Sequence, residues 1–226
     1  MHPQFNVLHS LFITKMKNFL FTSYFFVFMM ISCQSNAQTY TIETNLGNMQ
    51  IKLYEQTPLH KENFEKLLTE QFYDGVLFHR IIADFMIQTG DGATKENNSE
   101  NNLDYTIAAE FVPEYFHKKG VLAAARTGDF VNPEKRSSPS QFYIVQGRTY
   151  SDEELDQIAQ QLRIEFPASQ REIYKTIGGT PFLDQNYTVF GEVVKGLEVV
   201  DAIASLPTGP GDVPTMDIRI LRIVKD

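Results

Sequence analysis

The chain has 226 residues, a formal net charge of −8, one cysteine and no tryptophan. Its 42% apolar and 21% charged residues form an ordinary globular composition, far from that of disordered or collagen-like chains. This length fits one medium-sized domain with an appendage. A single cysteine excludes an internal disulfide framework and a cysteine-rich zinc module, and an acidic chain without basic clusters argues against a nucleic-acid partner.

The first 33 residues form a leader. Lys15 and Lys17 precede a nearly continuous apolar run over residues 19–31. A short basic region followed by about a dozen apolar residues is typical of a secretory signal and is too short for a comfortable transmembrane helix. Met16 fits the start of such a leader. We therefore expect an exported protein that faces the periplasm.

Two cleavage sites compete at the end of this leader. Residues 30–33 read M-I-S-C, which resembles a bacterial lipobox, in which Cys33 is lipidated and becomes the new N-terminus. Residues 35–37 offer an A-x-A-like site for ordinary signal peptidase, and cleavage after Ala37 would leave a soluble periplasmic protein. We favour the lipobox, because the one cysteine lies where lipidation needs it. Acyl chains on this residue would anchor the protein to a membrane without spanning it.

The rest of the chain divides into a short linker, residues 34–38, and one domain over residues 39–226. The domain opens with two runs of alternating apolar and polar residues around a turn at residues 45–48, which predicts a β-hairpin. Thr57 and Pro58 then predict the start of a helix, with Thr57 as the N-cap and proline in the first turn.

Short β-rich runs follow, separated by loops rich in glycine, asparagine, serine and proline. A second helix is predicted over residues 196–205 and a last strand over residues 219–224. Many short strands with two helices indicate a mainly β fold, namely a closed, eight-stranded antiparallel barrel whose ends the helices cap. The other predicted strands cover residues 76–82, 85–88, 121–125, 141–145 and 188–194.

Residues 151–177 interrupt this β-rich pattern with two helical runs. Ser151 and Glu154 form a capping box, and apolar residues follow at helical spacing on both sides of Pro167. We predict a helical insertion between two strands of the barrel. Two roles remain open, since a segment of this length is either a surface excursion packed on the barrel wall or an element that docks a partner or gates the substrate.

The usual catalytic motifs are absent from the sequence. The histidines that follow the leader, His60, His79 and His117, show no metal-ligand spacing, so a metal site is not expected. The sequence has no nucleophile elbow, phosphate-binding loop or dinucleotide fingerprint. We therefore expect a function that needs no cofactor.

The densest chemical signal is an apolar β-run with Arg80 near its start. An arginine there is unfavourable unless it is paired or faces a cleft. Alternation places Arg80, Met86 and Gln88 on one face, and Gln141 shares a face with Tyr143 in another run. A cleft with one guanidinium, amide side chains and aromatic rings suits a neutral peptide with an apolar side chain. From these residues alone, a surface-strand arginine beside core aromatic residues is the simpler interpretation.

Several stretches of the chain, in the right order, resemble signature sequences of the cyclophilins. Residues 78–91 resemble F-H-R-[IV]-I-x-x-F-M-[IV]-Q-x-G-D, residues 140–144 resemble S-Q-F-F-I, and residues 182–184 and 189–191 resemble W/F-L-D and V-F-G. Cyclophilins are peptidyl-prolyl cis–trans isomerases, and their fold is an eight-stranded antiparallel barrel capped by two helices. The resemblance therefore implies an isomerase that accelerates the rotation of X–Pro bonds in exported proteins as they fold. Its partners would be proline-containing unfolded or flexible polypeptides, and we expect a monomer.

The resemblance also implies roles for the residues that match it. Arg80 resembles the catalytic arginine, and Gln88 and Gln141 resemble the groups that hold the substrate backbone and orient this arginine. Ala125 and Arg126 lie where the family presents its backbone to the peptide. The walls of the proline pocket are matched by Phe85, Met86, Tyr143 and Leu183.

Three positions depart from the family pattern. Phe182 stands where many eukaryotic members have tryptophan, and Tyr187 stands where they have histidine; both remain predicted substrate-binding residues. These two changes place tight cyclosporin binding in doubt more than isomerase activity. Tyr143 replaces the usual phenylalanine, and its hydroxyl adds polarity to the pocket.

Two other classes of protein compete with this interpretation. A non-catalytic chaperone or peptide-binding module on the same fold would use the groove or the insertion to hold unfolded clients, but the retention of Arg80 and both glutamines favours the enzyme. A small-ligand-binding barrel of the lipocalin type is disfavoured, because the helices and the signature stretches do not belong to that class.

Overall fold

The computed structural model describes residues 38–96 and 103–226. The predicted leader, with the lipidation site at Cys33 and the alternative cleavage after Ala37, lies outside these residues. Within the described part of the chain, no helix combines the length and the apolar character that crossing a membrane requires.

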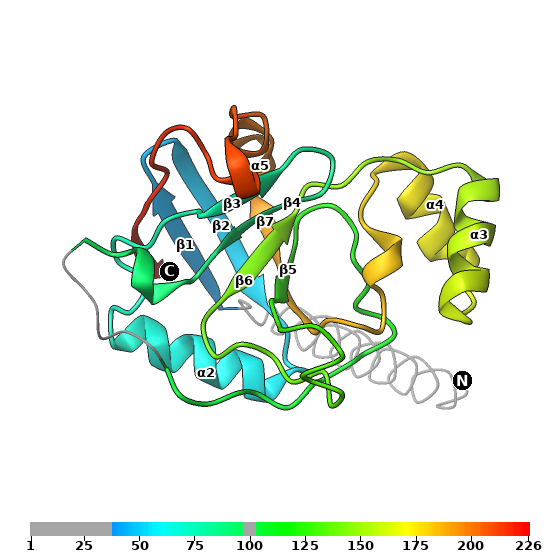
Figure 1. The fold of residues 1–226 in the computed structure, drawn as a ribbon, viewed down its shortest axis with the longest axis horizontal. Coiled ribbons are helices and arrows are strands. Elements are labelled where there is room, and N and C mark those ends of the chain that lie inside the picture. The colour runs from blue at the N-terminus through cyan, green and yellow to red at the C-terminus, as the bar shows by residue number, and fades with distance from the viewer. Residues whose placement is uncertain (1–37, 97–102) are drawn as a thin grey trace, which may run out of the picture. The chain divides into compact units, whose positions relative to one another are not determined.

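One antiparallel sheet of eight strands forms the body of the domain (Figure 1). Its strands are β1 (Thr39–Thr44), β2 (Gly47–Leu53), β3 (Arg80–Ile82), β4 (Met86–Thr89), β5 (Val121–Ala124), β6 (Phe142–Val145), β7 (Val189–Lys195) and β8 (Ile220–Lys225). They lie across the sheet in the order β3-β4-β6-β5-β7-β2-β1-β8. β1 and β2 form the predicted hairpin, with Thr44 opposite Gly47 at its turn. The mainly β prediction is therefore confirmed.

The strand ladder does not close into a barrel. β3 and β8 lie at opposite ends of the strand order. The segment before β3 reaches the start of β8 through the 2.8 Å bond from the Gly75 N–H to the Ile220 carbonyl. Just before β8, it forms an isolated bridge between Leu77 and Arg219 and a 2.8 Å bond from the Phe78 N–H to the Ile218 carbonyl. The predicted closed barrel is thus wrong: the sheet is a half-barrel, because residues 76–79 approach β8 without regular pairing.

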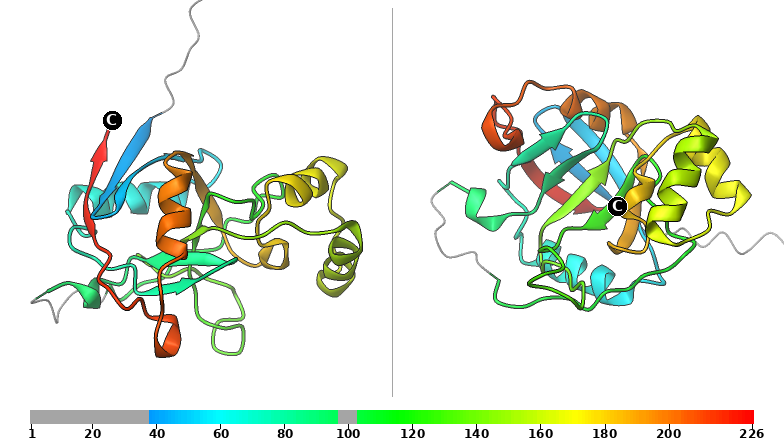
Figure 2. Two further views of the ribbon diagram at one scale, coloured as in Figure 1. Left: turned by 90° about the horizontal axis from the view of Figure 1, so that it is seen from above. Right: turned by 45° about the vertical axis from the view of Figure 1, so that its right-hand side comes forward.

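Four α-helices are found in the described part of the chain: α2 (Pro58–Thr69), α3 (Asp152–Leu162), α4 (Ala168–Thr176) and α5 (Leu197–Ala204). The 3₁₀ helices there are η1 (Gly92–Thr94), η2 (Pro181–Leu183) and η3 (Pro210–Asp212). The two predicted capping helices are α2 and α5, which lie at opposite ends of the sheet (Figures 1 and 2).

The two faces of the sheet bury different clusters. Alternate residues of a strand point to opposite faces, so Ile87, Phe142 and Ile144 enter the main core with side chains from α2 and α5. Their neighbours Met86 and Tyr143 point the other way and form a second cluster. This second face carries the candidate site.

The start of α2 is capped from a distance. Thr57 precedes the helix as predicted, but its hydroxyl donates to the Tyr54 carbonyl and does not cap the helix. The Glu110 carboxylate instead accepts the backbone N–H groups of Leu59 and His60, each at 3.1 Å. A carboxylate in this position satisfies free N–H groups and interacts favourably with the helix dipole. Thr57 is therefore the N-cap residue with Pro58 in the first turn, as predicted, but the side chain that binds the free N–H groups is that of Glu110.

The structure has the helical hairpin predicted at residues 151–177, between β6 and β7 (Figure 1). The capping box forms as expected, because Ser151 Oγ accepts the Glu154 N–H and the Glu154 carboxylate accepts the Ser151 N–H. The hairpin encloses a small apolar cluster of its own. The buried members of this cluster are Tyr150, Leu155, Phe166 and Tyr174.

Candidate active site

A cavity of about 250 Å³ lies on the second face of the sheet. Every residue that lines it belongs to the set predicted from the sequence, and the two other members of that set, Gln141 and Phe182, contact lining residues from the side. The lining residues are Arg80, Phe85, Met86, Gln88, Ala125, Arg126, Tyr143, Leu183 and Tyr187.

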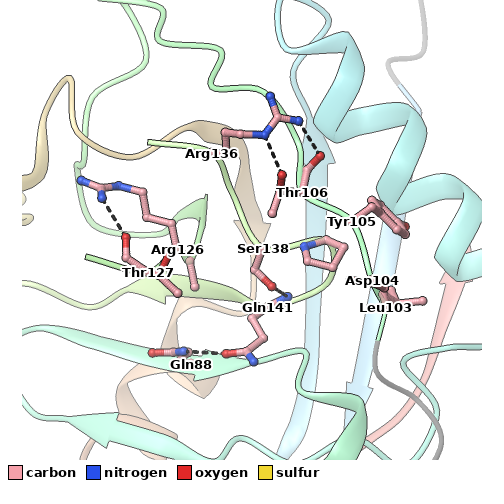
Figure 3. Close-up of a pocket in the computed structure, with 12 residues that line it drawn as sticks. Gln88, Leu103, Asp104, Tyr105, Thr106, Arg126, Thr127, Arg136, Ser138 and Gln141 are labelled. Atoms are coloured by element: carbon pink, nitrogen blue, oxygen red, sulfur yellow. Dashed lines mark hydrogen bonds between the residues drawn. The ribbon is translucent and has the colours of Figure 1, made fainter. Parts of the chain in front are cut away.

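Three neighbouring strands place a row of functional side chains along this cavity. Arg80 on β3 lies opposite Gln88 on β4, and Gln88 lies opposite Tyr143 on β6. Residues directly opposite each other in antiparallel strands point to the same face. The Gln88 amide also donates to Gln141 Oε1 at 3.2 Å (Figure 3). The strand pairing therefore explains the alternation that the sequence shows around Arg80.

The Arg80 guanidinium has one fixed side and one open side. Its Nε donates to Asp212 Oδ2 at 3.2 Å, and the two side chains are 41% and 44% exposed. Among the described residues, its two terminal nitrogens have no hydrogen-bond partner. Asp212 lies in η3, far from Arg80 in the sequence, and no motif indicated it. The ion pair orients the guanidinium while the terminal donors remain available to a ligand.

The aromatic walls are held by specific contacts. Phe182 packs on Phe85, with ring centroids 5.6 Å apart. The Arg126 guanidinium lies 4.5 Å from the Tyr187 ring centroid and donates to the Asn186 carbonyl at 2.8 Å. A cation over an aromatic ring is attracted by the negative face of that ring. Arg126 therefore stabilises the position of Tyr187 in the cavity wall.

Ala125 and Arg126 differ in their free backbone groups. The Ala125 N–H donates to the Gln141 carbonyl at 2.9 Å, and its carbonyl accepts the Ser138 N–H at 2.8 Å. Arg126 makes no backbone hydrogen bond within the described ranges. The open backbone groups next to the cavity are therefore those of Arg126.

Tyr143 forms the buried end of the row. Its hydroxyl lies 3.1 Å from His117 Nε2, and His117 Nδ1 lies 2.8 Å from Asp184 Oδ1. Burial, aided by Tyr187 and Asp184, raises the pKa of Tyr143 well above its usual value, so the phenol stays protonated. Sequence reasoning missed the role of His117, because a lone histidine carries no pattern.

A second cavity, of about 620 Å³, adjoins the first, and Figure 3 shows the residues that line it. The two share Gln88, Ala125 and Arg126. On its far side, Arg136 holds the neighbouring segment by donating to the Thr106 hydroxyl at 2.6 Å and to the Thr106 carbonyl at 2.9 Å.

His60 lies between Glu110 and Ser137, in the order of a serine-hydrolase triad. Its Nδ1 is 2.6 Å from Glu110 Oε2, and its Nε2 is 2.9 Å from Ser137 Oγ. However, Ser137 is only 1% exposed and His60 only 3%, so no substrate reaches this serine. The three residues instead join α2 to the segments that border the second cavity.

Comparison with known proteins identifies the family. Residues 39–225 match the family model described as cyclophilin type peptidyl-prolyl cis-trans isomerase/CLD. A relative from Staphylococcus saprophyticus, assigned as a peptidyl-prolyl cis–trans isomerase, is 36% identical over 180 residues, which cover 79% of this chain and 87% of the relative.

Solved structures agree with this match at the level of the fold. A cyclophilin-type isomerase of Cryptosporidium parvum has a TM-score of 0.62 at 24% identity, covering 84% of this chain and 97% of the other. Its crystal structure in the presence of the dipeptide Ala-Pro has a TM-score of 0.61 at 23% identity, covering 84% and 99%. Since the family model spans nearly all of the described chain, the protein belongs to the cyclophilin-type peptidyl-prolyl cis–trans isomerases.

Proposed function

We propose that the 250 Å³ cavity binds the proline of an X–Pro segment and that Arg80 accelerates rotation about the preceding peptide bond. One observation carries this assignment: the row of Arg80, Gln88 and Tyr143 across three paired strands. The row puts a cation with free donors and an amide beside an apolar pocket. This set of groups suits a neutral proline-containing peptide.

The reaction needs no bond to be broken. The rotation barrier of ~18–20 kcal/mol arises from amide resonance, and uncatalysed rotation takes tens to hundreds of seconds. In the twisted state resonance is lost and the prolyl nitrogen becomes pyramidal and basic. A donor aimed at its lone pair binds the twisted state better than either planar state, and such differential binding lowers the barrier.

The described geometry suits this mechanism. Asp212 engages Arg80 Nε from one side, so the terminal nitrogens are the donors that would face the prolyl nitrogen. The linked amides of Gln88 and Gln141 would hold the peptide backbone beside them, together with the open backbone groups of Arg126. Packing of the ring in the pocket and fixation of the chain outside it would confine rotation to one bond. The apolar residues that grip the ring are Phe85, Met86, Tyr143 and Leu183.

Substitution of the arginine tests the proposal. We expect Arg80→Ala to lower kcat/KM at least tenfold, about 1.4 kcal/mol, in a protease-coupled assay with a proline tetrapeptide. Far-UV circular dichroism checks that the fold is intact. Arg222→Ala is the matched control, because this arginine pairs with Glu43 at the surface, outside the cavity. An unchanged rate in Arg80→Ala would refute the assignment.

We further propose that the substrates are unfolded or flexible segments of exported proteins. A proline-containing ligand is supported by the related crystal structure obtained in the presence of Ala-Pro. A non-catalytic chaperone on the same fold would suppress aggregation of a client equally well in wild type and Arg80→Ala, whereas the isomerase would speed a proline-limited refolding phase only with Arg80 present. The refolding comparison therefore separates the two functions.

The proposed membrane anchor rests on the sequence around Cys33. The pattern M-I-S-C at residues 30–33 and the basic, apolar leader before it support lipidation of this cysteine on a periplasm-facing protein. Metabolic labelling with palmitate should mark the wild type and not Cys33→Ala. A wild type without label would leave the soluble form cleaved after Ala37.

A further inference from the structure

A continuous chain of buried hydrogen bonds joins the helical insertion to the cavity. The Tyr174 hydroxyl on α4 lies 2.7 Å from Asp184 Oδ2, Asp184 Oδ1 lies 2.8 Å from His117 Nδ1, and His117 Nε2 lies 3.1 Å from the Tyr143 hydroxyl. All four side chains are at most 5% exposed. One end of the chain is in the insertion, and the other end lines the pocket for proline.

The chemistry of the carboxylate fixes the direction of the hydrogen bonds that it makes. A carboxylate only accepts, so Asp184 accepts the Tyr174 hydroxyl, the His117 Nδ1–H and the His117 backbone N–H. In the neutral imidazole, His117 Nε2 is then the free acceptor, and the Tyr143 hydroxyl donates to it. Burial raises the pKa of both tyrosines well above the usual value, so both phenols keep the protons that these bonds need.

The same chain reaches two walls of the pocket. Tyr143 is one wall, and its ring lies nearly parallel to the His117 ring, at 15° and 6.2 Å between centroids. Asp184 follows directly after Leu183, which is another wall. The Asp184 carboxylate accepts three hydrogen bonds. It therefore positions the end of η2 as well as the His117 imidazole, which contacts Tyr143.

We propose that the insertion acts as a positioning element for the isomerase site, with Tyr174, Asp184 and His117 as positioning residues that hold Tyr143 and Leu183 in place. The proposal rests on the proposed function of the cavity. Removal of the Tyr174 hydroxyl leaves Asp184 Oδ2 buried without its donor. An unsatisfied buried acceptor is strongly unfavourable, so the carboxylate and His117 are expected to shift, and Tyr143 loses its alignment.

A double-mutant cycle on kcat/KM separates positioning from general stabilisation. The variants are Tyr174→Phe, Tyr143→Phe and their combination. We expect Tyr174→Phe to lower kcat/KM by about threefold or more in the presence of Tyr143, within the range of measured couplings between sites. In the Tyr143→Phe background the factor should be smaller, because only the effect through Leu183 remains. Equal factors in both backgrounds, or no effect in either, would overturn the proposal.

Tyr150→Phe is the matched control for the cycle. Tyr150 belongs to the same buried cluster of the insertion as Tyr174, and its ring lies 6.4 Å from that of Tyr174, but its hydroxyl is outside the chain. We expect its kcat/KM to stay within about twofold of the wild type. A loss equal to that of Tyr174→Phe would mean that any perturbation of the insertion affects the site, which contradicts a role of the specific chain.

A second measurement does not depend on catalysis. With ¹³C-labelled tyrosine rings, the Tyr143 signals are assigned by their loss in Tyr143→Phe. They should shift in Tyr174→Phe and stay in place in Tyr150→Phe, and unshifted signals in Tyr174→Phe would overturn the proposal. If the wild type and Arg80→Ala showed the same isomerase rate, the proposed function would fail, while the ring signals would still decide whether the chain positions Tyr143.

Discussion

Glu110 holds the start of α2, and its removal should be strongly destabilising. Its carboxylate accepts two backbone N–H groups of the first helical turn and lies 2.6 Å from His60 Nδ1. Loss of an N-cap typically destabilises by about 0.5–2 kcal/mol, and an unsatisfied buried polar group by about 1–3 kcal/mol. His60 is 3% exposed, so water does not replace the lost acceptor. Because one carboxylate serves all three donors, the losses overlap, and we expect Glu110→Ala to lower the free energy of unfolding by about 2–4 kcal/mol.

Urea unfolding followed by far-UV circular dichroism measures this loss, since the chain has no tryptophan to report by fluorescence. Glu114→Ala is the matched control: Glu114 is exposed, so its removal should change the stability by less than about 0.5 kcal/mol. Glu110→Gln keeps an oxygen acceptor without the charge and should fall between the two. A loss in Glu110→Ala no larger than that of the control would refute the distant cap.

Two further predictions concern pH and the site. Burial lowers the pKa of His60 and His79 below the ordinary value of 6.5, so below this pH the unfolded chain binds more protons than the native one and the free energy of unfolding falls. Urea midpoints should therefore drop from about pH 7.5 to about pH 5.5, with a smaller drop in His60→Gln; an equal drop in that variant would exclude His60 as a source. Asp212→Ala removes the partner of Arg80 Nε, and both side chains of this pair are partly exposed. Because a surface ion pair contributes little free energy, kcat/KM should fall by less than about fivefold. A tenfold loss, equal to that of Arg80→Ala, would show that Asp212 does more than orient the guanidinium.

The predictable parts of the fold are those with a local pattern. The alternation in β1 and β2, the helical spacing of α2 and α5, and the capping box at Ser151 depend on residues close in sequence. Closure of the sheet has no such local pattern. It depends on how far residues 76–79 pair with β8, which lies at the other end of the chain. The side chain that caps α2 could not be predicted for the same reason: Thr57 is the N-cap residue, but Glu110 binds the free N–H groups from a distant loop.

The candidate site likewise has parts that a local sequence pattern predicts and parts that depend on residues distant in the sequence. Arg80, Met86 and Gln88 line one cavity, as their alternation in a strand predicts, and the signature stretches bring in Leu183 and the other walls. The partners of these residues could not be predicted. Asp212 lies in a turn rich in glycine and proline, where an aspartate is usual for the turn itself. Its contact with Arg80 depends only on tertiary structure.

Tyr143 links two features of the sequence that depart from the family pattern, its own hydroxyl and the helical insertion. A hydroxyl in place of the usual phenylalanine, inside an apolar pocket, is unfavourable by about 1–3 kcal/mol unless it has a partner. His117 supplies that partner, and Asp184 holds the imidazole in place through Nδ1. Asp184, itself buried, has Tyr174 from the insertion as a further donor. The tyrosine in the pocket and the inserted hairpin therefore depend on each other, although the sequence presents them as a single substitution and a separate insertion.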